Sequence, residues 1–127
     1  MTSQVHETVM AYFEAVDPNP ESAERFIALF DEQAHFEDPV GSRTLVGHEG
    51  IAKFHKGLTR AWSQLRMSPE RIYVRGSQAA VSWTAEGHSA TGKDIQFDGI
   101  NLIEVDSNGR ISSLRGYWDL EAMIAQM

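Results

Sequence analysis

The stretch IQFDGINLIEVDSNGRISSLRGYW, residues 95–118, alternates apolar and polar side chains on both sides of one tight turn. A period of two is typical of β-strands, because successive side chains of a strand point to opposite faces. The turn contains Asn108-Gly109, and this dipeptide is a strong signal of a β-hairpin. We therefore predict an antiparallel hairpin made of strands 95–105 and 111–118.

The first strand of this hairpin places one polar side chain on its apolar face. That face holds Phe97, Asn101, Ile103 and Val105. We expect the Asn101 amide to be buried there and to need hydrogen-bond partners. Asp98 falls on the opposite face, unless a bulge at Gly99 changes the register, and a glycine within a strand often marks a bulge.

The residues before this hairpin change from a helical period to a strand period at about Met67. Apolar residues recur at helical spacing over 3–16 and 48–65, and Ala23, Phe26, Ile27 and Phe30 give a second helix after Pro20. Two more strands are expected at 72–74 and 79–85, and a short closing helix at 119–126. Three helices followed by antiparallel strands indicate an α+β fold in which helices cover a curved sheet and leave a pocket.

Length, charge and cysteine content restrict the class of protein. A chain of 127 residues suits a single domain, residues 1–127. The net charge of −7 disfavours nucleic acid and anionic membranes as partners, because phosphates would be repelled. The absence of cysteine excludes thiol chemistry, and the N-terminus lacks the features of a secretion signal, so a cytoplasmic protein is expected.

Asp38 is the first candidate for chemistry. It begins the turn Asp38-Pro39-Val40-Gly41-Ser42 and has apolar neighbours at Phe36 and Leu45. Partial desolvation would raise the pKa of its carboxyl and make it a better general base. The alternative is an ordinary turn residue, because Asp-Pro is a common turn pair.

Tyr12 and His55 face inward on their predicted helices. The buried Tyr12 hydroxyl needs a hydrogen-bond partner, which could be structural or a bound ligand. His55 could be a core residue or a proton carrier. The five histidines form no helical His-x-x-x-His pair, and no glycine-rich phosphate loop is present, so no metal site is expected.

Three motifs occur in the same order as in a known family. They are Tyr12-Phe13-Glu14-Ala15-Val16-Asp17, Phe36-Glu37-Asp38-Pro39-Val40-Gly41, and the segment from Gly109 to Trp118. Together they resemble the steroid Δ5-isomerases (ketosteroid isomerases) of the NTF2-like, or SnoaL-like, superfamily. The resemblance implies a cone-shaped α+β fold, with three N-terminal helices packed on a curved, mainly antiparallel sheet around an apolar pocket, and no cofactor.

The resemblance also implies roles for individual residues. Asp38 matches the proton shuttle, and Tyr12 matches the tyrosine that donates a hydrogen bond to the substrate carbonyl oxygen. Asn101 stands where the family has a protonated aspartate as the second donor, with Asp98 as the alternative. His55 stands where some members have a tyrosine that bonds the catalytic tyrosine.

The reaction implied is the shift of a double bond from Δ5 to Δ4 in an apolar, steroid-like ketone, an activity of lipid metabolism. The residues expected to line the substrate pocket are Val9, Phe13, Phe54, His55, Trp62, Trp83, Leu114 and Trp118. Two alternatives are a SnoaL-like polyketide cyclase and a module that binds an apolar molecule without turnover. A homodimer is expected, because the exposed face of such a sheet often pairs.

Overall fold

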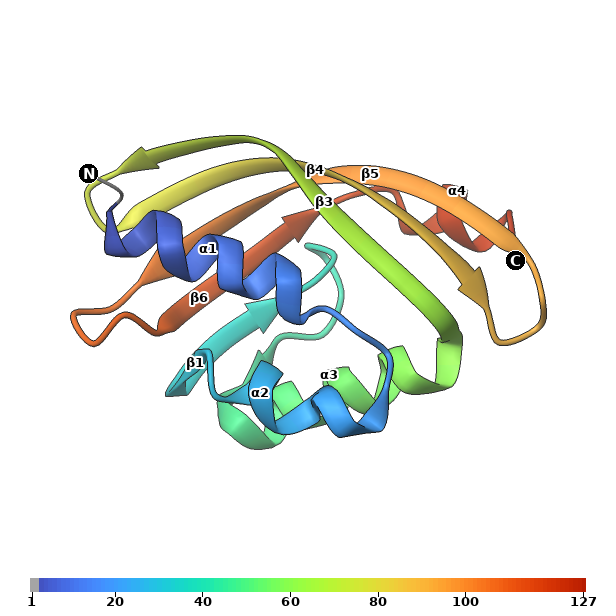
Figure 1. Cartoon of the computed structure of the whole chain (residues 1–127), viewed down its shortest axis with the longest axis horizontal. Helices are drawn as coiled ribbons and strands as arrows, with labels where there is room; N and C mark the ends of the chain where they lie inside the picture. Colours follow the sequence, from blue (N-terminus) through green and yellow to red (C-terminus); the bar gives the residue numbers. More distant parts are fainter. Residues whose placement is uncertain (1–2) are drawn as a thin grey trace.

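The computed structural model describes residues 3–127, which fold into helices and a single sheet (Figure 1). In chain order the elements are α1 (Gln4–Ala15), the 3-10 helix η1 (Pro20–Ser22), α2 (Ala23–Ile27), β1 (Phe30–Glu37), β2 (Leu45–Val46), α3 (Gly47–Ala61), β3 (Trp62–Arg75), β4 (Gln78–Ser89), β5 (Asp94–Val105), β6 (Ile111–Tyr117) and α4 (Leu120–Ile124).

The sheet has six strands in the order β2-β1-β6-β5-β4-β3. β1 runs parallel to β6, and the other four pairings are antiparallel. The predicted hairpin is confirmed as β5–β6, and Gly109 adopts a φ of 79° in its turn, a conformation that glycine reaches without a steric cost. The α+β fold with a curved, mainly antiparallel sheet is therefore confirmed.

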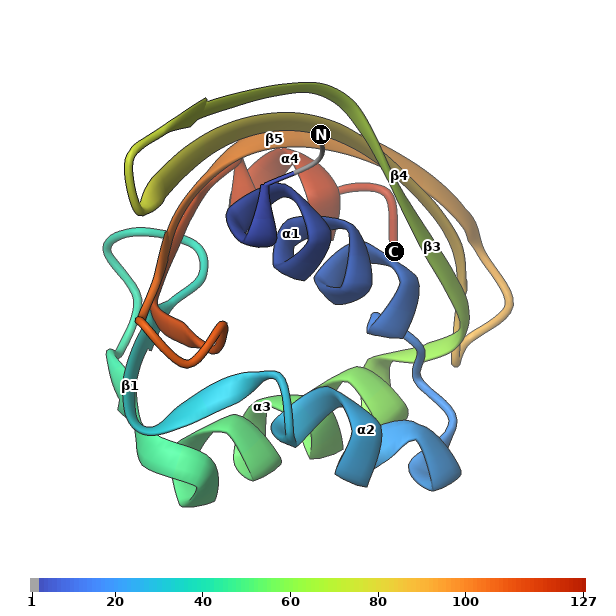
Figure 2. The ribbon, with the colours of Figure 1, turned by 60° about the vertical axis from the view of Figure 1, so that its left-hand side comes forward.

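The helices lie on the inner, concave face of this sheet. Figure 2 shows the sheet curving around α1, with α2 and α3 across the opening from β3 and β4. Tyr12 of α1 packs against Phe26 with ring centroids 5.8 Å apart, and Phe36 of β1 packs against Phe54 of α3 at 4.4 Å. The first contact joins two helices, and the second joins α3 to the sheet.

The boundary of the second helix was predicted wrongly. Phe30 has the helical spacing, but α2 ends at Ile27 and Phe30 is the first residue of β1. The strand forms because its backbone pairs with β6: the Ile111 amide donates to the carbonyl of Leu29, 2.8 Å away, and Phe36 lies beside Leu114. A helical repeat of four apolar residues cannot reveal a pairing with a strand at the far end of the chain.

The third helix is also shorter than expected. It ends at Ala61, and β3 starts at Trp62 rather than at Ile72, so Trp62 and Leu65 belong to a strand. This half of β3 is an edge strand paired with the end of β4, and Trp62 and Leu65 also fit the helical spacing of the preceding helix, so the helical period was extended too far. Among residues 3–127 no helix is long and apolar enough to span a membrane.

Candidate active site

A cavity of about 320 Å³ lies between the helices and the inner face of the sheet. We call it the inner cavity, and its walls are formed by Tyr12, Val16, Asp38, Pro39, Ser42, Phe54, Leu58, Trp62, Leu65, Met67, Trp83, Phe97, Trp118, Leu120 and Met123. Among the described residues of this wall, Tyr12 and Asp38 are the only ionisable ones. An enclosed apolar space with few convergent polar groups is the usual form of a small-molecule site.

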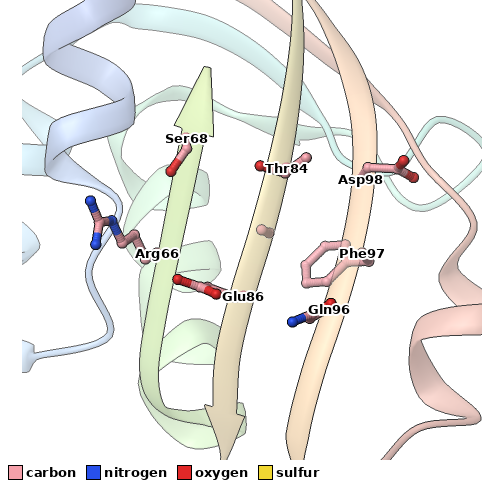
Figure 3. Close-up of a pocket in the computed structure, with 8 residues that line it drawn as sticks. Arg66, Ser68, Thr84, Glu86, Gln96, Phe97 and Asp98 are labelled. Carbon is pink, nitrogen blue, oxygen red and sulfur yellow. The ribbon is translucent and has the colours of Figure 1, made fainter. Parts of the chain in front are cut away.

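The outer face of the sheet also has a hollow, but its character is different. Figure 3 shows Arg66, Thr84, Glu86, Gln96 and Asp98 projecting from the adjacent strands β3, β4 and β5. This hollow of about 490 Å³ is open to solvent along the flat outer surface, and most of its lining side chains are polar. The inner cavity is therefore the better candidate site, because it is less open to solvent and carries Tyr12 and Asp38, whose pKa values are raised.

Asp38 follows β1 and presents its carboxylate to the inner cavity. The Trp118 indole N–H donates a hydrogen bond to Oδ1 of Asp38. The peptide bond between Asp38 and Pro39 is cis, and the turn is attached to β6 because the Val40 amide donates to the carbonyl of Gly116, 2.7 Å away. Burial raises the pKa of the Asp38 carboxyl to about 6, and the Trp118 hydrogen bond opposes that rise.

Gly116 makes room for this carboxylate. A methyl group at residue 116 would overlap with Oδ1 of Asp38 and would lie 3.1 Å from Oδ1 of Asn101. Gly116 pairs with Asn101 across β5 and β6. The missing side chain thus lets the Asp38 carboxylate approach the sheet next to Asn101.

Tyr12 lies on α1 with only 1% of its surface exposed, and it contributes to the cavity wall. Burial raises the pKa of its hydroxyl well above the ordinary value, and the negative charge of Asp38 raises it further. The Asn101 amide, which faces the hydroxyl, opposes this rise. Tyr12 consequently keeps its proton at neutral pH and can donate a hydrogen bond into the cavity.

Asn101 is buried on the inner face of β5, as the strand period predicts. Its Oδ1 accepts a hydrogen bond of 3.0 Å from the indole N–H of Trp83, and its Nδ2 has no partner within residues 3–127. The alternative that a bulge turns Asp98 inward is wrong. The pairing of β4 with β5 continues without a shift through Gly99, so Asp98 lies on the outer face (Figure 3).

The structure brings some of the predicted pocket residues to the inner cavity and leaves others in the core. Phe54, Trp62, Trp83 and Trp118 line the cavity, whereas Val9, Phe13, His55, Leu114 and Asn101 are not part of its wall. His55 packs against Phe26 with ring centroids 5.7 Å apart, and its Nε2 makes no hydrogen bond to Tyr12 or to any other described residue.

Several wall residues were missed. Leu65 and Met67 alternate along the first half of β3, where the predicted helix ends and no strand was predicted, and Leu120 and Met123 belong to the closing helix. The strand alternation at Leu65 and Met67 was available as a signal. The hydrogen bond between Trp118 and Asp38 joins residues 80 positions apart, and no local sequence pattern predicts it.

The sequence profile of the SnoaL-like domain matches residues 9–114, most of the chain. The chain belongs to the SnoaL-like family. Over 120 residues this family member is 28% identical to a steroid Delta-isomerase of Nocardioides simplex, and the match covers 93% of this chain and 92% of the relative.

Two solved structures illustrate the fold of this SnoaL-like protein. A putative SnoaL-like polyketide cyclase from Jannaschia sp. CCS1 has a TM-score of 0.84 at 17% identity, covering 97% of this chain and 90% of that one. An LEH-like epoxide hydrolase of M. tuberculosis has a TM-score of 0.80 at 22% identity, covering 98% and 90%. These likenesses establish the NTF2-like fold, and a fold alone does not determine the reaction.

Proposed function

We propose that this protein is an enzyme that moves a proton within an apolar ketone, as ketosteroid isomerases do. Asp38 removes a proton from the carbon next to the carbonyl and returns it at a more distant carbon, so that a double bond shifts from Δ5 to Δ4. One observation carries the proposal: a carboxyl with a pKa of about 6 shares an apolar cavity with a buried hydroxyl that keeps its proton.

The two protonation states suit the two halves of this reaction. At neutral pH most of the Asp38 carboxyl is ionised and can act as a base, yet its raised pKa also lets it hold the proton between the two transfers. Tyr12 donates a hydrogen bond to the oxygen of the dienolate. The Nδ2 of Asn101, which has no partner within residues 3–127, is proposed as the second donor: Asn101 is not in the cavity wall itself, but its amide faces the Tyr12 hydroxyl, which is. Fixed donors near a developing oxyanion are usually the largest contribution to catalysis.

The cavity walls favour a flat, uncharged substrate. Phe97 stacks on Trp62 with ring centroids 5.9 Å apart and packs edge-on against Trp83 at 5.6 Å. In the part of the chain that the structure describes, no lysine or arginine lines the cavity to pair with a phosphate or carboxylate of a ligand. We therefore propose a steroid-like ketone as the substrate, bound without a cofactor.

Conversion of a Δ5-3-ketosteroid, followed by the absorbance of the conjugated enone, tests the proposal. The parent protein should turn over, and Asp38→Asn should keep the fold and the ligand affinity but lower kcat by at least about a hundredfold, since it removes the base. Binding without turnover would instead favour a module that only carries an apolar ligand. Turnover restricted to a larger aromatic precursor would favour a polyketide cyclase.

We further propose a homodimer in the cytoplasm. Tyr73, Ile100, Leu102 and Tyr117 are exposed on the outer face of β3, β5 and β6, and Leu102 lies between Ala80 and Arg115 across the strands. Burying these side chains in a twofold contact would remove apolar surface from water. Light scattering after size exclusion should give twice the chain mass for the parent and the chain mass for Leu102→Glu.

A further inference from the structure

Trp83 contacts the site with two different parts of its side chain. Its indole ring lines the inner cavity, and its N–H points to Asn101 and donates the 3.0 Å hydrogen bond to Oδ1. Both residues are almost fully buried, with 2% and 1% of their surfaces exposed. Gly99 makes room for this arrangement, because a methyl group there would lie 2.6 Å from Cζ2 of Trp83.

The direction of this hydrogen bond decides which end of the amide faces Tyr12. An asparagine has an acceptor end and a donor end, and its orientation is assigned from its partners. An indole N–H can only donate, so the oxygen of Asn101 must face Trp83. The Nδ2 group is then turned away from Trp83, and it is the end without a protein partner.

We infer that Trp83 is a positioning residue, which holds the Asn101 amide so that only its NH2 group faces the Tyr12 hydroxyl and an oxyanion bound there. The opposite orientation would be harmful. The Asn101 oxygen would then accept a hydrogen bond from the Tyr12 hydroxyl. Tyr12 would thus donate to the protein instead of to the ligand. The inference deepens the proposed isomerisation and rests on it for its catalytic consequence, whereas the orientation itself can be measured without turnover.

The orientation is tested by placing a carboxyl at residue 101. In Asn101→Asp the indole N–H would donate to the carboxylate, which favours the ionised form. Adding Trp83→Phe removes that donor, so the pKa of the introduced carboxyl, followed by its ¹³C resonance, should rise by about one unit. Trp62→Phe in the same background is the matched control, because Trp62 also lines the cavity but makes no hydrogen bond to Asn101. In this control the titration midpoint of the carboxyl at residue 101 should not move.

The catalytic consequence is tested by a double-mutant cycle on the ketosteroid. Trp83→Phe should lower kcat by about tenfold, through loss of orientation at the reacting groups. In the Asn101→Ala background the same change should lower kcat no further, because there is no amide left to orient. An equal loss in both backgrounds would mean that the indole acts by packing alone, and it would overturn the inference.

The outcomes separate this inference from the proposed function. If Trp83→Phe shifts the titration midpoint of the residue-101 carboxyl but the parent protein shows no turnover, the orienting role of Trp83 is upheld and the isomerase proposal is rejected. If the parent protein turns over the ketosteroid but Trp83→Phe does not shift this midpoint, the inference about Trp83 is rejected and the isomerase proposal is retained. Should the double variant fail to fold, the indole N–H resonance of Trp83 gives the answer in single variants: it should shift in Asn101→Leu, which removes its acceptor, and an unchanged resonance would overturn the inference.

Discussion

Burial acts on two side chains, Asp38 and Tyr12, and leaves them in different protonation states at neutral pH. Burial disfavours the charged form of both and so raises both pKa values. For the carboxyl, which ordinarily titrates far below neutrality, the rise brings the pKa to about 6, close to neutral pH. For the phenol the rise leads away from neutrality, and the hydroxyl remains a donor. Within residues 3–127 the inner cavity thus holds one carboxyl that ionises near neutrality and one hydroxyl that stays protonated, and no further ionisable side chain.

Trp118 should set the pH at which the base becomes active. Its hydrogen bond favours the ionised Asp38, so Trp118→Phe should raise the pKa of that carboxyl above about 6. Because the ionised form is the base, the acidic limb of the kcat/KM profile should move to higher pH. Trp62→Phe, which removes another cavity indole without touching Asp38, should leave the limb in place. An unmoved limb in Trp118→Phe would contradict this assignment.

Tyr12→Phe removes one hydroxyl and keeps the ring. The ring contacts with Phe13, Phe26 and Phe30 should survive, so the fold should too. If the hydroxyl donates to the oxyanion, kcat should fall on the order of a hundred- to a thousandfold. Steady-state kinetics and urea unfolding on the same samples distinguish the roles: a less stable protein with an unchanged kcat would make Tyr12 a structural residue.

The strands and turns show where sequence reasoning succeeds. Alternation over 95–105 is local and unbroken, so it correctly predicts that Asn101 is buried and that Asp98 is exposed when no bulge forms. The hairpin to β6 follows from the Asn108-Gly109 turn. Helical spacing correctly predicts that Tyr12 and His55 are buried, but burial does not distinguish a cavity wall from the core behind it.

The same reasoning fails where a distant strand decides the local structure. Phe30 becomes a strand residue because β6 supplies the pairing partner, and that parallel pairing brings Glu37 beside Arg115. Asp38 follows directly, which is why its carboxylate lies over Gly116 and against Trp118. The site is therefore assembled by the contact of β1 with β6, and no period within either segment encodes it.

The contact between the Asp38 turn and β6 predicts the effect of a single methyl group. Gly116→Ala would place a carbon where Oδ1 of Asp38 lies, so the carboxylate must move. We expect kcat to fall by at least about tenfold, since a small misplacement of a reacting group is costly. Gly57→Ala on α3 is the control, because its new methyl group meets nothing within 4 Å and should stabilise the helix by about 0.5–1 kcal/mol. Equal activity of the two variants would show that Asp38 needs no such space.

The protein as one body is an incomplete shell of sheet around an apolar space. The sheet curves around α1, and α2 and α3 cover the opening, so the inner cavity is bounded on several sides by elements from both halves of the chain (Figure 2). These walls remove much of the solvent around the Asp38 carboxyl and the Tyr12 hydroxyl, which strengthens the electrostatic effects of both groups. Ionising Asp38 also places a charge in apolar surroundings. The free energy of unfolding should therefore decrease when this carboxyl ionises.

The pH dependence of stability follows from the sign of that pKa shift. The pKa of the Asp38 carboxyl is about 6 in the folded protein, against an ordinary value of 3.8 in an unfolded chain. The folded state therefore binds the proton more tightly. The resulting stabilisation is fully present below the unfolded pKa and is lost as the pH rises through about 6. Above that range the buried charge costs on the order of 2–3 kcal/mol, from about 1.4 kcal/mol for each pKa unit.

Asp38→Asn cannot ionise, so it should avoid this cost. Urea unfolding should find the parent and Asp38→Asn about equally stable at pH 4, and the variant more stable by on the order of 2–3 kcal/mol at pH 8. The comparison isolates one group, because the repulsion among the other charges of this acidic chain, net −7, is nearly the same in both proteins and cancels in the difference. A difference in unfolding free energy that stays constant from pH 4 to pH 8 would mean that the Asp38 carboxyl is as well solvated in the folded protein as in the unfolded chain, and the argument for a poised base in the inner cavity would fail with it.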